Sequence, residues 1–273
     1  MLYIENEFFK GQIGPEQGAR LLSLTGKRWG NPESIVKAPC GGQVAGQKAT
    51  AFPLIPFGGR LQDGIFAWQD GTVQLPCKPG EFILHGDGAR RRWQVSRHSE
   101  NSLTLEIKYP SAGWPFPAHV QIRYLLRGPV FWALFAVRNL CDRPIPFGLG
   151  WHPYLAFSKD HWLTCNVTHR ARLNSAGFSP QLRADPGSLT LTSRDGPATW
   201  QFRLGPGPIS VGRNLVPIYD IFFSSTVDYL VAHLAPDNAC VAIEPLTHPL
   251  HDPGACIVPA GGRRTMAVSL RLR

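Results

Sequence analysis

An all-β fold made of antiparallel strands is the class that this sequence predicts. Its 28 glycines and 25 prolines are spread along all 273 residues and leave little room for long helices. Between them lie short segments in which apolar and polar residues alternate, the pattern of strands that bury one face. Asp-Gly pairs at Asp63, Asp70, Asp87 and Asp195 provide the residues that tight turns require.

The clearest alternation lies in four segments, which we predict to be strands with one buried face: 103–109, 120–124, 199–204 and 266–272. The segment VFWALFAV, residues 130–137, has no polar face and predicts a strand that is covered on both sides. A sheet of this size needs a second layer to cover it. We therefore expect a large antiparallel β-sandwich.

The chain shows no internal repeat, low-complexity tract or change in composition that would mark a domain boundary. Its hydrophobic content of 43% and charged content of 17% are typical of a well-packed globular protein. Because β-sandwiches of this length commonly form one unit, we expect residues 1–273 to be a single domain.

Composition also narrows the classes of partner. The formal net charge is +9, but the arginines are dispersed except at 90–92 and 263–264, so we expect no nucleic acid partner. The start, MLYIENEFFKG, has no apolar signal segment, and the longest apolar run is far too short to span a membrane. We therefore expect a cytoplasmic protein without a membrane partner.

The sequence lacks the motifs of common cofactor sites. The six cysteines show neither a CxxC spacing nor a Cys/His cluster, so we expect reduced thiols and no metal. No GxxxxGK[ST] motif, dinucleotide-binding loop or GxSxG nucleophile segment is present. We expect no cofactor.

The segment GLGWHPYLAF, residues 148–157, places one histidine among glycines, aromatic residues and a proline. Pro153 biases His152 toward extended or turn geometry, which predicts a strand end where the side chain can face a cleft. Histidine is the commonest general acid or base, because its ordinary pKa lies near neutrality. The structural alternative is a ring that packs between Trp151 and Tyr154 and hydrogen-bonds a carbonyl.

Glu244 ends an apolar segment and precedes Pro245. Strand alternation places Val241 and Ile243 on one face and Glu244 on the other, next to two small residues that leave space for a ligand. Glu244 is therefore a candidate general base. The alternative is an exposed glutamate that pairs with an arginine.

Three further residues are candidates for ligand binding. Arg60 follows two prolines and two glycines, which let the backbone approach a ligand, and its guanidinium offers donors to hydroxyl or carboxylate oxygens. His85 lies in a second glycine-containing loop, LHGDG. For both, a structural role in the turn is the alternative. Asp220 has apolar and aromatic neighbours, which predicts either a hydrogen-bonded buried carboxylate or an acceptor for a sugar hydroxyl.

Taken in order, these segments resemble those of the aldose 1-epimerase (galactose mutarotase) family. Its members carry a Pro-Phe-x-x-Arg segment, a His-Gly loop, a His-Pro-Tyr segment, an aspartate before an aromatic-rich strand and a late Glu-Pro. The corresponding residues here are 56–60, 85–86, 152–154, 220 and 244–245. Each motif is weak alone, but five in the same order are hard to obtain by accident.

The resemblance implies an all-β supersandwich of the galactose mutarotase type, with an open sugar cleft and no required metal. It implies that His152 is the general acid, that Glu244 is the general base, and that Arg60, His85 and Asp220 bind sugar hydroxyls. The expected reaction is the interconversion of the α and β anomers of a hexose such as galactose or glucose. The expected assembly is a monomer or homodimer.

Other functions stay open from the residues alone. The excess of arginine is compatible with an epimerase that acts on a hexose 6-phosphate, which predicts an arginine cluster beside the cleft. A sandwich that only binds carbohydrate would keep the cleft without acid–base function. A glycosidase with Asp220 and Glu244 as its carboxylate pair would leave His152 without a role.

Overall fold

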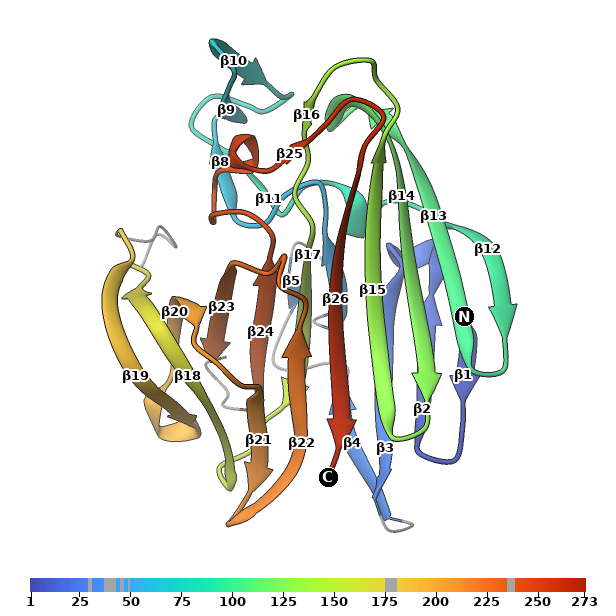
Figure 1. Cartoon of the computed structure of the whole chain (residues 1–273), viewed down its shortest axis with the longest axis vertical. Helices are drawn as coiled ribbons and strands as arrows, with labels where there is room; N and C mark the ends of the chain where they lie inside the picture. The colour runs from blue at the N-terminus through green and yellow to red at the C-terminus, as the bar shows by residue number, and fades with distance from the viewer. Residues whose placement is uncertain (29–30, 37–42, 45–46, 49, 175–180, 235–238) are drawn as a thin grey trace.

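The computed structural model describes residues 1–28, 31–36, 43–44, 47–48, 50–174, 181–234 and 239–273 (Figure 1). In these residues the regular structure is almost entirely antiparallel β-strand, which confirms the predicted all-β class. The helices are single 3-10 turns: η1 (Pro15–Gln17), η2 (Gly88–Arg90), η3 (Ser193–Asp195) and η4 (Pro253–Ala255). The described part of the chain therefore holds no helix with the length and apolar character of a membrane span.

One layer, which we call the cleft sheet, carries the candidate catalytic residues. Its strands pair antiparallel in the order β1 (Leu2–Glu5), β2 (Phe9–Gly14), β3 (Arg20–Arg28), β7 (Ala51–Leu54), β17 (Gly150–Ala156), β24 (Cys240–Leu246), β23 (Tyr229–Leu234) and β20 (Ala198–Leu204). Strand β4 (Asn31–Val36) pairs with β3 and touches β17 at its end.

The second layer, the cover sheet, packs against the first. Its antiparallel order is β12 (Gln94–Ser99), β13 (Ser102–Ser111), β14 (Trp114–Arg127), β15 (Val130–Asn139), β26 (Arg263–Leu272), β22 (Val216–Phe223) and β21 (Ile209–Arg213). Two-stranded ribbons lie outside the two sheets: β5 (Gln43–Val44) with β6 (Gln47–Lys48), β8 (Arg60–Gln62) with β11 (Phe82–Leu84), β9 (Ile65–Trp68) with β10 (Gly71–Gln74), and β16 (Ile145–Pro146) with β25 (Ile257–Val258).

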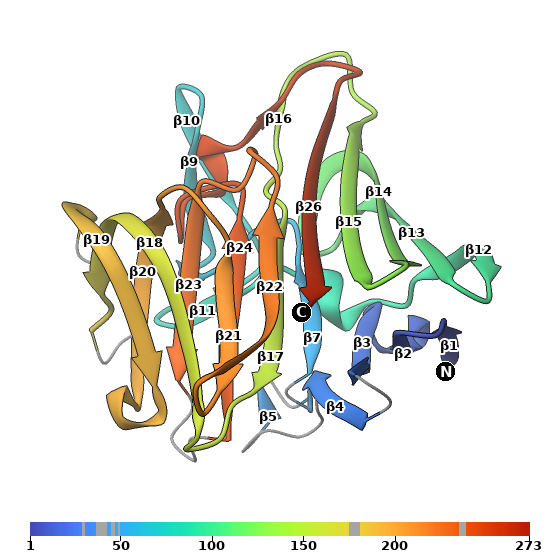
Figure 2. The same ribbon diagram turned by 60° about the horizontal axis from the view of Figure 1, so that its bottom comes forward.

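Strand β18 (His161–Arg172) joins the two layers. Its first residues pair with β21 of the cover sheet, and its last residues pair with β20 of the cleft sheet. The register shifts between Val167 and His169, where the strand passes from one layer to the other. Strand β19 (Arg183–Thr192) completes this edge (Figures 1 and 2).

The core lies between the two sheets. Trp151 and Ile243 of the cleft sheet face Phe131, Ile221 and Val268 of the cover sheet across a common apolar interior. The rings of Trp151 and Phe131 are stacked with their centroids 6.3 Å apart. Because side chains alternate along a strand, each inward residue on β17 and β24 sends its neighbours to the opposite face of the cleft sheet.

The four alternating segments are confirmed as parts of β13, β14, β20 and β26. Segment 130–137 is also a strand, but the expectation that both of its faces are covered is wrong. Phe131 and Phe135 are buried, whereas Trp132 and Leu134 are only half-buried. These two residues lie on the outward face of the cover sheet, so their apolar side chains shield that surface without entering the core.

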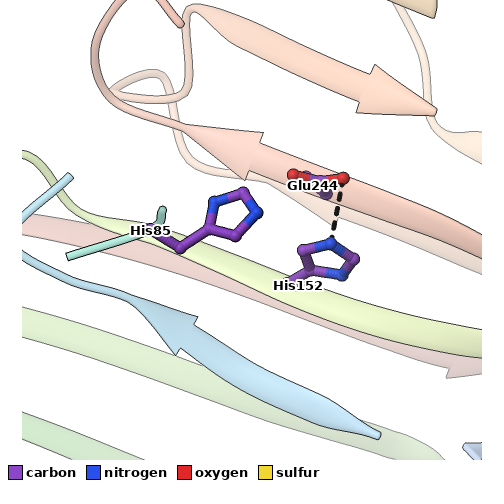
Figure 3. Close-up of side chains that lie close together, drawn as sticks. All are labelled: His85, His152 and Glu244. Atoms are coloured by element: carbon purple, nitrogen blue, oxygen red, sulfur yellow. Dashed lines mark ion pairs between the residues drawn. The ribbon is translucent and has the colours of Figure 1, made fainter. Parts of the chain in front are cut away.

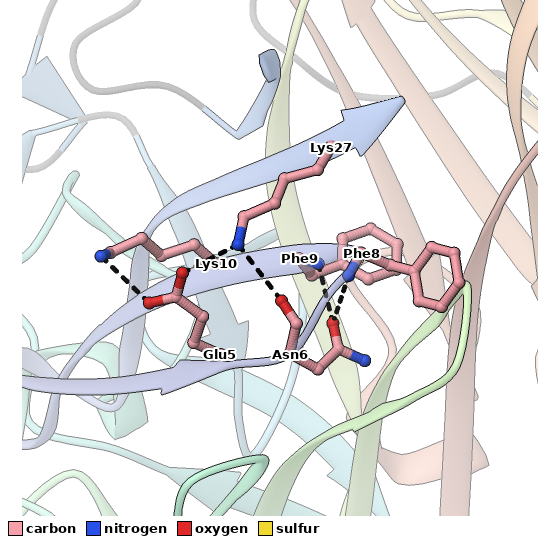
Figure 4. A network of polar contacts seen from close by, with 6 residues as sticks. All are labelled: Glu5, Asn6, Phe8, Phe9, Lys10 and Lys27. Atoms are coloured by element: carbon pink, nitrogen blue, oxygen red, sulfur yellow. Dashed lines mark hydrogen bonds and ion pairs between the residues drawn. The ribbon is translucent and has the colours of Figure 1, made fainter. Parts of the chain in front are cut away.

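Polar contacts hold the hairpin that begins the cleft sheet (Figure 4). The Asn6 side-chain oxygen accepts hydrogen bonds from the backbone N–H groups of Phe8 and Phe9, at 3.0 and 2.8 Å. Lys10 and Lys27 both pair with the Glu5 carboxylate, at 3.0 and 2.9 Å. These ion pairs are half-exposed and contribute little to stability. The hydrogen bonds to the Asn6 side chain therefore set the shape of the turn between β1 and β2.

The cysteines correct one expectation. Cys77, Cys141, Cys165 and Cys256 are free thiols. Cys240, on β24, is bonded in a disulfide, so the prediction of uniformly reduced cysteines is wrong for this residue. Cys40 lies outside the described residues.

Gly86 allows the chain after β11 to pass close to β7. Its φ is +60°, and a Cβ added there would lie 2.3 Å from the carbonyl oxygen of Ile55. Gly261 has the same φ of +60° but open space around it, with nothing within 4 Å of an added Cβ. Both glycines therefore have a left-handed backbone, but only Gly86 lacks space for a side chain.

We predict that Gly86→Ala lowers the free energy of unfolding by about 2–4 kcal/mol, because overpacking adds to the cost of the left-handed backbone. Gly261→Ala should cost only about 1 kcal/mol, which is the backbone contribution alone. Chemical denaturation of the two variants measures the difference. Equal losses of stability would show that the close approach to Ile55 is not a constraint.

Candidate active site

A cleft lies on the face of the cleft sheet opposite the core. Arg60, His85, His152 and Glu244 line it together, around a cavity of about 320 Å³. The structure thus brings together four of the five residues that the sequence singled out, from segments up to 184 residues apart.

His152 and Glu244 form the centre of the cleft (Figure 3). His152 Nε2 lies 3.1 Å from Glu244 Oε1, and both side chains are nearly inaccessible to solvent. The His152 ring is stacked between Phe52 and Tyr154, with centroid distances of 4.6 and 4.7 Å. The structural alternative placed the ring between Trp151 and Tyr154. The contact with Tyr154 is present, but the contact with Trp151 is wrong, because Trp151 precedes His152 along the strand and points into the core.

Alternation along β24 explains why Glu244 faces the cleft. The core side of β24 carries Val241, Ile243 and Pro245, which are buried. The cleft side carries Ala242 and Glu244. The predicted division of the two faces is therefore confirmed.

Burial sets the protonation of this pair. It raises the pKa of Glu244 to about 8, and the positive charge of Arg60 opposes this rise. Burial also lowers the pKa of His152 well below 6.5, and the nearby His85 ring lowers it further. Near pH 7 the pair therefore holds one proton between the carboxyl and the imidazole, because neither buried group favours its charged form.

His85 presents a fixed hydrogen-bond donor to the cleft. Its Nδ1 accepts a hydrogen bond from the Gly59 N–H at 3.0 Å, and burial lowers its pKa to about 3. The ring is therefore neutral, and its single proton lies on Nε2. Its centroid is 5.5 Å from that of His152, with the two rings almost perpendicular.

Three successive backbone amides position Arg60, and each donates to a histidine. The N–H groups of Gly58, Gly59 and Arg60 donate to His248 Nε2, His85 Nδ1 and His251 Nδ1 at 3.1, 3.0 and 2.7 Å. Burial lowers the pKa of His248 to about 4, so this ring is a neutral acceptor like His85. The Arg60 guanidinium lies over the Phe82 ring, 5.2 Å from its centroid.

Asp220 does not belong to this cleft. Its carboxylate accepts hydrogen bonds from Arg273 at 2.6 and 2.9 Å and from the Ser210 hydroxyl at 2.7 Å. It lies on β22 of the cover sheet and is not among the described residues that line the cavity. The prediction of a substrate-binding role is therefore corrected: Asp220 is the hydrogen-bonded, buried carboxylate that was its structural alternative.

His233 and Thr199 are among the cleft residues that were not predicted from the sequence. His233 lies on β23, and its Nδ1 is 2.8 Å from the Thr199 hydroxyl of β20. Both side chains face the cavity. The signal was a single histidine in the apolar segment YLVAHL, but only strand pairing places it beside Glu244.

The same cleft offers donor atoms to a cation. His85, His152 and Glu244 each have a donor atom within 4.8 Å of the others. However, coordination by His85 Nε2 would move its proton to Nδ1, where it would face the Gly59 N–H. The hydrogen bonds present therefore suit a neutral donor at His85 better than a metal ligand.

Comparison with known proteins agrees with this architecture. The aldose 1-epimerase family model matches residues 10–196. Two uncharacterised proteins of Escherichia coli K12, YphB and YihR, are each 34% identical to this chain over 112 and 119 residues. These matches cover 40% and 42% of this chain, and they span only 38% and 36% of the two relatives.

Solved structures share the fold over almost the whole chain. A galactose mutarotase-like protein from Lactobacillus casei has a TM-score of 0.78 at 20% identity, with 100% of both chains covered. The galactose 1-epimerase from Lactobacillus acidophilus has a TM-score of 0.78 at 15% identity, with 99% of this chain and 93% of that chain covered. A galactose mutarotase-like protein from Clostridium acetobutylicum has a TM-score of 0.81 at 15% identity, with 99% and 94% covered. Because the family model matches well over half of the sequence, the chain belongs to the aldose 1-epimerase family.

Proposed function

We propose that this protein is an aldose 1-epimerase that interconverts the α and β anomers of a hexose. The observation that carries this proposal is the buried contact of 3.1 Å between His152 Nε2 and Glu244 Oε1 in a cleft with further hydrogen-bonding groups. A buried acid and base whose pKa values are shifted by their surroundings are typical of a catalytic site.

The reaction needs one base and one acid. The reactive state is the one in which the single shared proton lies on His152. Glu244 as carboxylate then removes the proton from the C1 hydroxyl while His152 as imidazolium protonates the ring oxygen, so that the C1–O5 bond breaks and an open-chain aldehyde forms. Rotation about C1–C2 presents the other face of the aldehyde. The same two groups then return the protons in reverse, and the ring closes as the other anomer. The pair has the same number of protons before and after the cycle, so no co-reactant is required.

The surrounding groups suit the binding of a polyol. The neutral His85 offers an Nε2–H, the Arg60 guanidinium offers charged donors, and His233 faces the same space. Glu244 is the one carboxylate that lines the cleft in the described part of the chain. A glycosidase would need two such carboxylates, so this arrangement favours the epimerase.

The alternative of a protein that binds sugar without catalysis is less well supported. Burial of the Glu244 carboxyl and the His152 ring costs stability, and a site that only binds sugar has no need of an acid–base pair at this cost.

We predict that Glu244→Gln and His152→Asn each slow anomer exchange by about 10²–10⁴-fold, because each removes one proton-transfer group and keeps a side chain that can hydrogen-bond. The double variant should be little slower than the slower single variant, since the two groups act as a unit. Polarimetry or NMR exchange with galactose and glucose measures the rates. Wild-type rates in Glu244→Gln would remove the assignment of the base.

Thermal unfolding of the same variants serves as the control for folding. The folded-state pKa of Glu244 is raised to about 8, so the wild type loses stability as the pH rises toward that value. Glutamine does not titrate, and Glu244→Gln should therefore unfold at a temperature at least as high as the wild type at pH 9. If Glu244→Gln is inactive because it is unfolded at 25 °C, its loss of activity says nothing about the mechanism. The rate of the folded His152→Asn variant then tests the acid–base assignment.

The pH dependence follows from the single shared proton. We expect kcat/KM to be level near pH 7 and to fall about ten-fold per pH unit above about pH 8, where the pair loses the proton that serves as the acid. On the acid side, the rate should fall only below the usual histidine range, because the lowered pKa of His152 delays the second protonation. Rates corrected for spontaneous mutarotation at each pH give this profile. A rate that still rises between pH 8 and 10 would contradict it.

Arg60 should contribute to binding in the ground state and in the transition state. We predict that Arg60→Ala raises KM about ten-fold or more and lowers kcat less, because a guanidinium that holds hydroxyls binds both states. Arg60→Lys should fall between the wild type and the alanine variant, since lysine keeps the charge without the planar fork. Initial rates over a range of sugar concentrations separate the two constants. A loss confined to kcat would instead place Arg60 at the reacting atoms.

A further inference from the structure

A second cavity adjoins the catalytic cleft on the same face of the cleft sheet. It has a volume of about 420 Å³ and shares Leu250 and His251 with the cleft as a common wall. Its floor includes Gln201 and Arg203 of β20, with Tyr229 of β23 beside them. Together the two cavities form a groove that runs across the strands.

Strand register sets the length of this groove. Glu244 lies opposite Val231, and Val231 lies opposite Gln201, so the three residues form one row across β24, β23 and β20. Adjacent strands are about 4.8 Å apart, which places Gln201 about 10 Å from Glu244 along the sheet. A pyranose ring with C1 at Glu244 covers about one strand spacing. Only a group attached beyond that ring reaches Gln201.

Gln201 is a buried polar group that faces this space. It is 5% exposed, and it is one of the side chains that line the cavity. Its amide can both donate hydrogen bonds to, and accept them from, a ligand in this cavity. Sugar hydroxyls are both donors and acceptors.

Arg203 and Tyr229 contact each other beside Gln201. Arg203 Nη2 donates to the Tyr229 hydroxyl at 2.6 Å, and the guanidinium lies 4.7 Å from the centroid of the Tyr229 ring. An aromatic ring, a guanidinium and an amide suit the apolar face and the hydroxyls of a saccharide. A phosphate on the reacting ring would be attracted by Arg203, but it would leave Gln201 and Tyr229 unused.

We infer that the second cavity is a subsite for a second saccharide unit, so that the preferred substrate is the reducing end of a disaccharide or longer saccharide. This inference rests on the proposed function and specifies its substrate class. The reacting unit occupies the cleft at His152 and Glu244, and the next unit lies over Gln201 and Arg203.

The test compares anomer exchange of glucose with that of the reducing disaccharides lactose, cellobiose, maltose and melibiose, and with that of glucose 6-phosphate. We expect kcat/KM for at least one disaccharide to exceed that for glucose by about ten-fold, mainly through KM. Gln201→Leu and Arg203→Ala should each lower this ratio about ten-fold. The matched control is Arg172→Ala: Arg172 is also an arginine near the end of a paired strand, but it lies over Trp200 and lines neither cavity.

The outcomes separate this inference from the proposed function. Exchange of glucose without a disaccharide preference, or a preference that survives in both variants, overturns the subsite and leaves the epimerase intact. An Arg203-dependent gain for glucose 6-phosphate alone overturns it in favour of a phosphate site. If no aldose is exchanged, the proposed function fails. Calorimetric binding of methyl β-lactoside that weakens in Gln201→Leu would then still support the subsite, and the absence of such binding would overturn it.

Discussion

The buried contact between Glu244 and His152 is the constraint on which the rest of the site depends. Two groups that both disfavour charge in this environment stay 3.1 Å apart because they stand on the paired central strands β24 and β17. The inward neighbours of these residues, Ile243 and Trp151, are fixed in the core between the sheets. Core packing therefore holds the acid–base geometry, and the free energy of apolar burial offsets the cost of burying the pair.

The loop that carries Arg60 depends on a second electrostatic condition. Its three consecutive amides need three neutral histidine acceptors, and burial keeps His85 and His248 neutral at any physiological pH. The same hydrogen bond that orders the loop also fixes the proton of His85 on the nitrogen that faces the cleft. Loop position and donor chemistry are thus consequences of one set of contacts.

The topology explains why the groove is longer than a single sugar ring. Strand β18 leaves the cover sheet and adds to the edge of the cleft sheet beyond β20, which extends this sheet past β17 and β24. Polar residues on β20 then line this extension at alternate positions. Gln201 lies on this extension, two strands away from Glu244.

The sequence by itself determined the strands, the turn residues and the direction of Glu244, because these follow from local alternation and backbone preferences. It also singled out Arg60, His85 and His152, whose glycine- and proline-rich surroundings mark them locally. Only the tertiary structure decided which distant residues these polar side chains contact. Asp220 is neutralised by Arg273, 53 residues further along the chain, and His233 reaches the cleft only through its pairing with β24. Long-range pairing and burial set charge and accessibility, and no local pattern records which distant residue a side chain will meet.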